Sequence, residues 1–336
     1  MDRVRDLVDG GADVNEAGDG DITALMVGSL YGRLWIVAIL LAADAEADHA
    51  DSVGVTPLLL SSMEGHQLVV KLLLDKNAMV DKADNGGVTP LYISSHFGHK
   101  KVVKLLLDRG ATVDQAANDG ATALIISSQN GHHEVVKLLL DGGADVNQAS
   151  NNLVTALIAS CRYGHDKVVK LLLAEGAKVD QANNNGSTPL LISSYQGHQE
   201  VARLLLAKGA DVDLARNGGF APLSAASISG HHDIAELLLK SGANVDHATN
   251  NGRTALADAV RMGHTAVASL LRHWSLTILR RLATYASILY AIELEEGRAT
   301  QEEPVDELLQ RLARTPDDIV RVIVLFVGDG GVQRRS

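Results

Sequence analysis

The pattern of apolar positions repeats every 33 residues along most of the chain. A leucine triplet marks the period, as in Leu72-Leu73-Leu74 and Leu105-Leu106-Leu107. One unit cannot bury such a leucine ridge by itself, so neighbouring units must stack. The pattern therefore predicts an all-α repeat solenoid. A Gly-His pair keeps the same spacing at Gly65-His66, Gly98-His99, Gly131-His132, Gly164-His165, Gly197-His198, Gly230-His231 and Gly263-His264.

Each unit predicts two short helices joined by a tight corner. A threonine begins the first helix as its N-cap, where its hydroxyl accepts from free backbone N–H groups. Proline occupies the next position in four units, three times after threonine and once after Ala221, where the missing N–H donor costs little. The glycine of the Gly-His pair ends this helix, and a second glycine, or Asn77 or Asp44, ends the next one. The threonines are Thr23, Thr56, Thr89, Thr122, Thr155, Thr188 and Thr254, with Ala221 in the seventh unit; the prolines are Pro57, Pro90, Pro189 and Pro222; the second glycines are Gly110, Gly143, Gly176, Gly209 and Gly242.

The unit from Asp84 to Ala116, with the sequence DNGGVTPLYISSHFGHKKVVKLLLDRGATVDQA, resembles an ankyrin repeat. The resemblance implies a helix-turn-helix stack with projecting β-turn or hairpin loops. Eight such units occupy residues 18–274, and a partial N-terminal repeat occupies residues 1–17. The sequence begins at Met1 in the middle of a repeat. One interpretation is therefore that the gene model is incomplete at this end.

One position departs from the family pattern. The family's histidine after Thr-Pro-Leu is absent from every unit, and residues such as Leu59 and Tyr92 replace it. A serine pair often lies nearby, as at Ser94-Ser95. We weigh two interpretations: a serine hydroxyl takes over part of the lost hydrogen bonding, or apolar packing compensates without a new bond.

The 33-residue register breaks after Trp274. Apolar positions between residues 276 and 296 fall on one helical face, and Pro304 and Thr315-Pro316 mark further helix starts. Residues 275–336 are therefore predicted to be helical. Two interpretations stay open, namely a C-terminal cap over the last repeat or a docking segment for a second protein.

Composition and charge narrow the class of protein. The chain is 46% hydrophobic but only 3% aromatic, which suits the thin aliphatic core of a solenoid. Its net charge of −11 argues against a nucleic-acid partner, because a phosphate backbone requires a basic face. The single Cys161 fits a reducing compartment, and no secretory signal or membrane span is visible. We expect an intracellular, cytoplasmic protein without membrane insertion, and the nucleus is the alternative location.

No catalytic or metal-binding constellation stands out. Seven of the 13 histidines occupy the Gly-His corners, one unit apart, and cannot converge on one ion. Cys161 falls on a small helix-packing position and is expected to be a buried, inert thiol. Glycine-rich tips such as Asn85-Gly86-Gly87 lack the lysine and hydroxyl of a phosphate loop. The sequence therefore predicts no enzyme activity, cofactor, metal or small-molecule substrate.

The resemblance places partner contacts on the concave face, at the two residues before each Gly-His corner and at the residue before each threonine. Five of the seven aromatic residues between Gly18 and His273 occupy these variable positions. Aromatic and arginine side chains often dominate binding interfaces. Chance variation at these positions is the competing interpretation, and asparagines at the loop tips are also ordinary turn residues. The candidate partner-binding residues are Tyr31, Phe97, Arg162, Tyr163, Tyr195, Phe220, Arg253, Asn118, Asn151 and Asn184.

These observations predict a non-enzymatic protein–protein interaction module that binds a protein partner on its concave face. One alternative is an adaptor or scaffold whose C-terminal helices recruit a second protein, such as a ubiquitin ligase component. Another is a regulatory fragment of a larger enzyme or channel.

Overall fold

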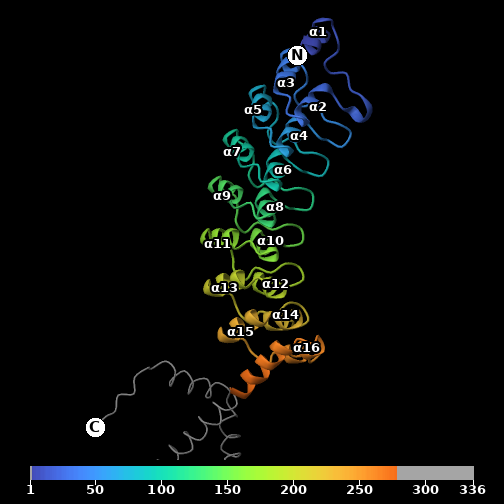
Figure 1. Ribbon diagram of the computed structural model, residues 1–336. Helices are drawn as coiled ribbons and strands as arrows, with labels where there is room; N and C mark the ends of the chain where they lie inside the picture. The colour runs from blue at the N-terminus through green and yellow to red at the C-terminus, as the bar shows by residue number, and fades with distance from the viewer. Residues whose placement is uncertain (1, 278–336) are drawn as a thin grey trace, which may run out of the picture. The chain divides into compact units, whose positions relative to one another are not determined.

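The computed structural model describes residues 2–277. The chain divides into two compact units, residues 1–270 and 271–336. The first unit consists of helix pairs in chain order (Figure 1). The first helices are α2 (Ala24–Leu30), α4 (Pro57–Met63), α6 (Pro90–His96), α8 (Ala123–Gln129), α10 (Ala156–Tyr163), α12 (Pro189–Gln196), α14 (Pro222–Ser229) and α16 (Ala255–Arg261). The second helices are α3 (Leu34–Ala42), α5 (Gln67–Asp75), α7 (Lys100–Asp108), α9 (His133–Asp141), α11 (Asp166–Ala174), α13 (Gln199–Ala207) and α15 (His232–Lys240).

Helix α1 (Asp2–Asp9) precedes these pairs, and a 3-10 turn, η1 (Asp19–Asp21), lies between α1 and α2. Residues 265–277 are helical as well, and they are the end of the described chain. The further helices expected in 275–336 therefore lie outside the described residues, apart from 275–277.

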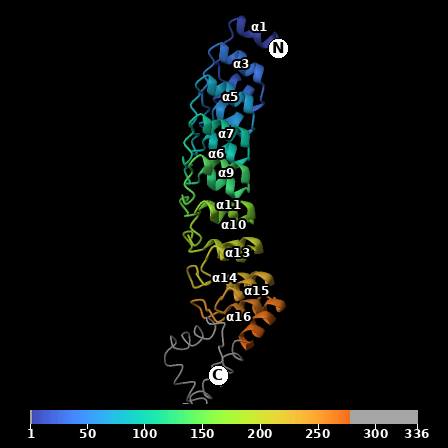
Figure 2. The same cartoon turned by 90° about the vertical axis from the view of Figure 1, so that its left-hand side faces the viewer.

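The helices form two parallel columns. Each first helix packs against the first helices before and after it, and the second helices do the same. Figures 1 and 2 agree that the connecting loops line up along one side of the column of first helices. Between residues 2 and 277 the loops contain isolated β-bridges but no extended strand. The predicted all-α repeat solenoid is confirmed.

The helix ends follow the predicted chemistry. Every threonine of the register caps its helix, and Thr122 Oγ1, for example, accepts a hydrogen bond from Ile125 N at 3.3 Å. Ala221 starts α14 without such a bond. The glycines of the corners and of the second helix ends have positive φ, as do Asn77 and Asp44 at 62°. These residues provide the left-handed backbone that closes each helix.

The leucine triplets form the core between the two columns. The middle leucine of each triplet is completely buried, as in Leu73, Leu106 and Leu139. The other core side chains are largely Val, Ile and Ala, and Phe220 is the single aromatic among the buried hydrophobic residues of the described chain. Each 33-residue unit therefore buries its leucines only by packing against the adjoining unit.

Histidines of the Gly-His corners tie successive repeats together. His132 Nε2, for example, is 2.9 Å from His96 O, and the other six corner histidines contact the carbonyl 36 residues earlier in the same way. The sequence excluded these residues as metal ligands but did not reveal this role. They are structural links between neighbouring corners.

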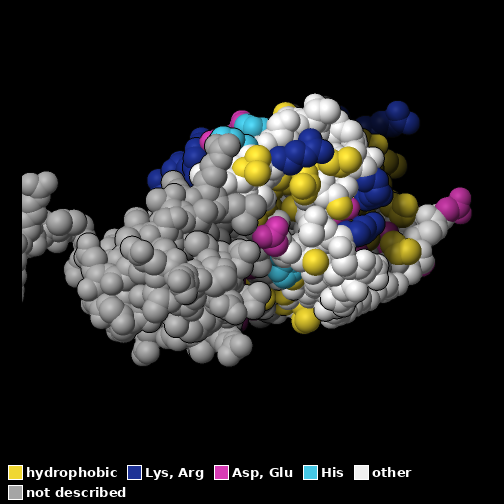
Figure 3. All heavy atoms as spheres, turned by 90° about the horizontal axis from the view of Figure 1, so that it is seen from below, with side chains coloured by type: hydrophobic (Ala, Val, Ile, Leu, Met, Phe, Trp, Pro, Cys, Tyr) yellow, Lys and Arg dark blue, Asp and Glu magenta, His cyan; other side chains and the backbone are white. Residues whose placement is uncertain are grey.

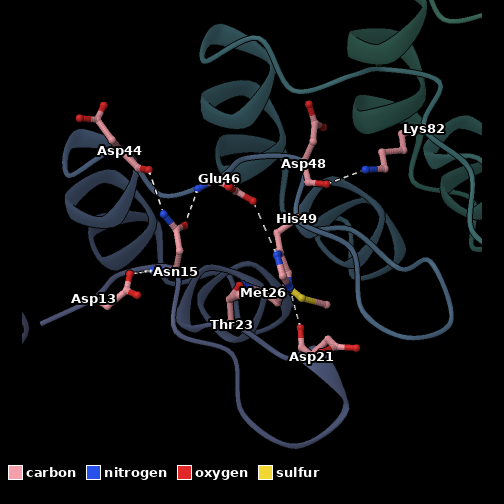
Figure 4. Close-up of polar contacts among 10 residues, drawn as sticks. All are labelled: Asp13, Asn15, Asp21, Thr23, Met26, Asp44, Glu46, Asp48, His49 and Lys82. Atoms are coloured by element: carbon pink, nitrogen blue, oxygen red, sulfur yellow. Dashed lines mark hydrogen bonds and ion pairs between the residues drawn. The ribbon is translucent and has the colours of Figure 1, made fainter.

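A second set of inter-repeat bonds joins the ends of the second helices. Asn15 Oδ1 accepts from Glu46 N at 2.8 Å, and Asn15 Nδ2 donates to Asp44 O at 3.4 Å (Figure 4). Lys82 Nζ donates to Asp48 O at 2.7 Å one repeat further on. Asp81, Asp114 and Asp180 accept backbone N–H groups of the following repeat in the same manner. The polar residues at these positions are therefore explained by stacking.

Candidate functional site

Four of the five predicted aromatic residues are exposed at the ends of first helices. The exposed fractions are 63% for Tyr31, 47% for Phe97, 52% for Tyr163 and 50% for Tyr195. Tyr31 and Phe97 are the C-caps of α2 and α6, while Tyr163 and Tyr195 lie in the last turns of α10 and α12. About half of the surface of each residue is open to solvent and available for contact with a partner.

Corner histidines hold two of these rings. Phe97 stacks on His99 with ring centroids 6.1 Å apart, and Tyr163 stacks on His165 at 6.3 Å. His96 meets Phe97 edge-on at 4.7 Å. A ring that is already held in place loses less conformational entropy when a partner binds it. Phe97 and Tyr163 are therefore partly pre-organised for binding.

Tyr31 belongs to a different part of the surface. It lines a hollow of about 520 Å³ at the N-terminal end of the stack, together with Leu7 of α1, Val27 of α2 and Ile36 of α3. This hollow lies where α1 packs against α3, next to α2. Tyr31 therefore sits apart from the aromatic residues of the third, fifth and sixth repeats.

The expectation that Phe220 is exposed is wrong. Its exposed fraction is 8%, and it packs in a core cluster with Leu191 and Ala225. Arg216 N donates to Phe220 O at 3.1 Å, a bond that recurs in the other hairpins, and the equivalent residues Ala121 and Ser187 are buried as well. The Arg216 guanidinium covers the outer side of the ring, 4.7 Å from its centroid.

Phe220 nevertheless lines a hollow with two other predicted residues. The hollow has a volume of about 270 Å³ and lies between α12 and the loop that precedes α14. Leu191, Ile192 and Phe220 form its apolar lining, and its polar lining includes Arg162, Tyr195 and Arg216. The fold thus brings Arg162, Tyr195 and Phe220 together from three successive repeats.

The sequence analysis did not identify Arg216, although a comparison with the equivalent residues of the other hairpins shows that arginine is unusual there. The equivalent residues are Gly18, Asp51, Asp84, Ala117, Ser150, Asn183 and Thr249 in the other hairpins. Most of these accept backbone N–H groups of their own loop, as when Asp84 Oδ1 accepts from Gly86 N and Val88 N. Arginine has no acceptor and cannot make such a turn. Its presence is a departure from the loop's structural chemistry.

Leu153 is a second residue that the sequence reasoning missed. It has φ 55° and an exposed fraction of 49% at the tip of the fifth hairpin. The equivalent residue is glycine in six hairpins and Asp21 in the first, all with positive φ. A bulky residue in the left-handed region is strained, and strained residues cluster at functional sites, which makes Leu153 a candidate contact residue.

The asparagines predicted as a polar rim are bonded within the stack. Asn118 Nδ2 donates to Asn85 O at 2.9 Å, and Asn151 Nδ2 donates to Asn118 O at 3.0 Å. Asn184 Nδ2 donates to Asn152 Oδ1 at 3.2 Å. This ladder links successive loop tips and accounts for the asparagines without a partner.

Arg253 is exposed but interacts with a buried carboxylate. Its Nε is 3.8 Å from Asp258 Oδ1, and Arg261 Nη2 approaches the same oxygen at 3.3 Å. Asp258 has an exposed fraction of 0%. The two guanidinium groups therefore compensate a buried negative charge in the last repeat. Arg253 has fewer N–H donors left for a partner as a result.

The space-filling view looks at the stack from its C-terminal end (Figure 3). Hydrophobic side chains and lysine or arginine side chains lie interspersed on the part that is not covered by grey atoms. Nucleic-acid-binding surfaces carry a continuous basic field, which the visible part of this end of the stack does not show.

The side chains that could act in catalysis or bind a metal ion are either buried and unreactive or do not cluster. Cys161 is buried, and loss of solvation raises the pKa of its thiol well above the ordinary value, so the reactive thiolate is disfavoured. No group of three or more His, Cys, Asp or Glu residues within 2–277 could hold a metal ion. In the same part of the chain, no helix is both long and apolar enough to cross a membrane.

The paired helices, capped corners and aligned loops define a repeat solenoid. A family model described as ankyrin repeats (3 copies) matches residues 25–117, 80–150, 112–183, 149–216 and 213–278. The chain belongs to the ankyrin repeat family, whose repeats generally act as protein–protein interaction modules rather than enzymes.

A solved structure shows the same architecture. The crystal structure of the human ASB11 ankyrin repeat domain is similar to this chain, with a TM-score of 0.61 and 26% sequence identity. The match covers 66% of this chain and 98% of that chain. No curated protein sequence matches the chain.

Proposed function

We propose that the chain is a non-enzymatic module that binds a protein partner on the surface formed by its first helices and hairpin loops. This surface corresponds to the concave face of the family. The observation that carries the proposal is the exposure of Phe97, Tyr163 and Tyr195 at corresponding ends of α6, α10 and α12. The core of this chain needs almost no aromatic residues, so core packing does not explain rings at these half-exposed positions.

The chemistry of this surface favours a protein over other ligands. Aromatic side chains that are half-exposed and held by neighbours are typical anchors of protein interfaces. A net charge of −11 opposes a polyphosphate partner. The buried, reduced Cys161 fits an intracellular compartment, where the module would meet its partner.

The proposal is tested by affinity purification from the native source with three forms of the chain. These are the wild type, the Tyr163→Ala/Tyr195→Ala variant and a Leu68→Ala control. Leu68 has an exposed fraction of 62% but lies on a second helix, α5, away from the proposed surface. We expect the same partner with the wild type and the control, and its loss with the double variant.

Circular dichroism and urea unfolding show whether all three forms are folded. Because both tyrosines are half-exposed, their truncation should change the free energy of unfolding by less than about 1 kcal/mol. An identical set of partners for the wild type and a folded double variant would refute the proposed surface.

A further inference from the structure

The hollow between α12 and the loop before α14 carries positive charge on an acidic protein. Two arginines, Arg162 and Arg216, line it, and none of its lining residues is Asp or Glu. The whole chain has a net charge of −11. Within residues 2–277 neither arginine forms an ion pair with a carboxylate, unlike Arg109, Arg203, Arg253 and Arg261. The hollow therefore offers two guanidinium groups to a ligand.

The fold holds the Arg216 guanidinium at the edge of an apolar surface. The group lies 4.7 Å from the centroid of the Phe220 ring, which is the geometry of a cation–π contact. The ring is fixed in turn, because it packs against Leu191 and Ala225. A charged group that is positioned in advance loses less entropy when it binds a ligand.

Arginine at position 216 is poorly explained by the loop itself. In the neighbouring loop Asn183 Oδ1 accepts from Asn185 N and Ser187 N, each at 3.0 Å. Arg216 cannot accept these bonds, and its own loop instead contains Gly218 and Gly219, both with positive φ. Arg216 therefore adds no side-chain hydrogen bond to its loop, and its guanidinium lies over the Phe220 ring instead.

The size of the hollow limits what can enter it. Pockets for drug-sized ligands and cofactors usually have volumes of about 300–1,000 Å³. The hollow has about 270 Å³, with Leu191, Ile192 and Phe220 as its apolar part. It therefore suits one or two side chains of a peptide rather than a cofactor.

We infer that this hollow is the specificity pocket for an acidic segment of the protein partner. An aliphatic side chain of the segment packs on Phe220, Leu191 and Ile192. A neighbouring Asp or Glu carboxylate pairs with Arg162 and Arg216, whose planar guanidinium groups match a carboxylate with paired hydrogen bonds. Tyr195 flanks the segment and connects the pocket to the aromatic surface. This inference rests on the proposed function and adds the chemistry of the partner.

The test uses a phage-displayed library of random 12-residue peptides selected on the full chain. Enriched peptides are synthesised, and their affinities are measured by fluorescence anisotropy for the wild type and for an Arg162→Gln/Arg216→Gln variant. Arg203→Gln is the matched control, because Arg203 is an exposed arginine on the second helix α13. We expect enriched peptides to place Asp or Glu beside an aliphatic residue.

Affinity should fall about tenfold or more in the double variant and remain unchanged in the control, because hydrogen bonds to charged groups contribute strongly. Replacing the peptide Glu by Gln should cause a similar loss with the wild type and none with the double variant. Enriched peptides without an acidic residue, or with equal affinity for the double variant, would overturn the inference. If such peptides bind less well to Tyr163→Ala than to the wild type, the proposed binding surface is supported and only the pocket is refuted. If they bind both forms equally well, the binding surface and the pocket are both refuted.

Discussion

The imidazole ring of His132 lies directly against Gly98, one repeat earlier. A methyl group on Gly98 would come within 2.6 Å of His132 Nδ1, and the same relationship recurs from Gly32 and His66 to Gly230 and His264. Gly98 also has φ 74°. From Gly32 to Gly230, the corner glycine therefore ends its own helix and also leaves space for the histidine of the next repeat. This double use explains why the Gly-His pair keeps its spacing through the array.

Gly98→Ala should therefore destabilise the protein by about 2–4 kcal/mol, through left-handed strain together with a clash in a packed interface. Gly110→Ala is the matched control. Gly110 has φ 80°, but a methyl group there would meet nothing within 4 Å. It should cost only about 1–2 kcal/mol. Urea unfolding measures both variants, and equal losses would show that the histidine contact is unimportant.

Much of the fold could be predicted from the sequence because the signals are local and repeated. Thr122, Gly131 and the leucine triplets define helix starts, corners and the buried ridge, and each works within one unit or between neighbours. The role of His132 was not predictable in the same way. Its hydrogen bond runs to His96 O, a backbone atom whose position depends on how tightly two corners approach each other.

The candidate site was less predictable for a related reason. The position of a residue within the repeat indicated whether it lies outside the core. Tyr163 and Tyr195 follow that rule. Phe220 does not, because its position in the hairpin faces the core, as the burial of the equivalent Ala121 and Ser187 shows. The ring turns inward there and Arg216 covers it. An inward or outward side chain in a loop depends on backbone angles that a repeat alignment does not contain.

The two adjacent serines of α6 should respond differently to truncation. Ser94 Oγ donates to Leu91 O at 3.1 Å, whereas the buried Ser95 hydroxyl has no protein partner within the described chain. Ser94→Ala removes a hydrogen bond, while Ser95→Ala removes an unpaired polar group. We expect Ser95→Ala to be more stable than Ser94→Ala by about 1–2 kcal/mol.

Helix propensity cancels in this comparison, because both variants replace serine by alanine in the same helix. The bond of Ser94 stays inside its own helix and does not reach the neighbouring repeat. It therefore gives limited support to the idea that serine takes over the missing histidine's role. Equal stabilities in chemical denaturation would favour simple apolar packing at both positions.

Acid should weaken the third repeat through His96. Burial, and then the charge of His132, lowers the pKa of His96 from 6.5. In addition, Asn130 Nδ2 lies 3.3 Å from His96 Nδ1, where a neutral ring can accept the hydrogen bond. The folded pKa is below the unfolded one, so the unfolded chain binds more protons between these values. The stability contribution is complete above pH 6.5 and is lost as the pH falls through the folded pKa.

NMR titration of the ring protons measures this directly, and we expect a His96 pKa below 6.5. Unfolding experiments provide a second measurement. Between pH 7 and pH 5 the wild type should lose more stability than His96→Gln, which keeps the other 12 histidines and removes only this group. A pKa at or above 6.5, together with the same loss in both forms, contradicts the prediction.

Replacing Leu153 should not lower the stability of the protein but should weaken partner binding. With φ 55° it is the one residue other than Gly or Asp at this position of the eight hairpins, and a left-handed leucine costs about 1–2 kcal/mol. Leu153→Gly relieves this strain but enlarges the conformational freedom of the unfolded chain, at a cost of about 0.5–1 kcal/mol. The net expectation is a gain of about 0.5–1 kcal/mol in the free energy of unfolding.

The same variant should bind the partner less well, because the half-exposed leucine is lost from the proposed surface. Leu153→Asn provides the control for the backbone, since asparagine tolerates positive φ but lacks the apolar side chain. Both variants should lose affinity, and neither should lose stability. If Leu153→Gly were stabilising while affinity stayed the same, the strained leucine would have no part in recognition, and the contact surface would lie closer to Tyr163 and Tyr195. A trade of stability for an exposed apolar group is what a binding loop requires and what a purely structural loop avoids.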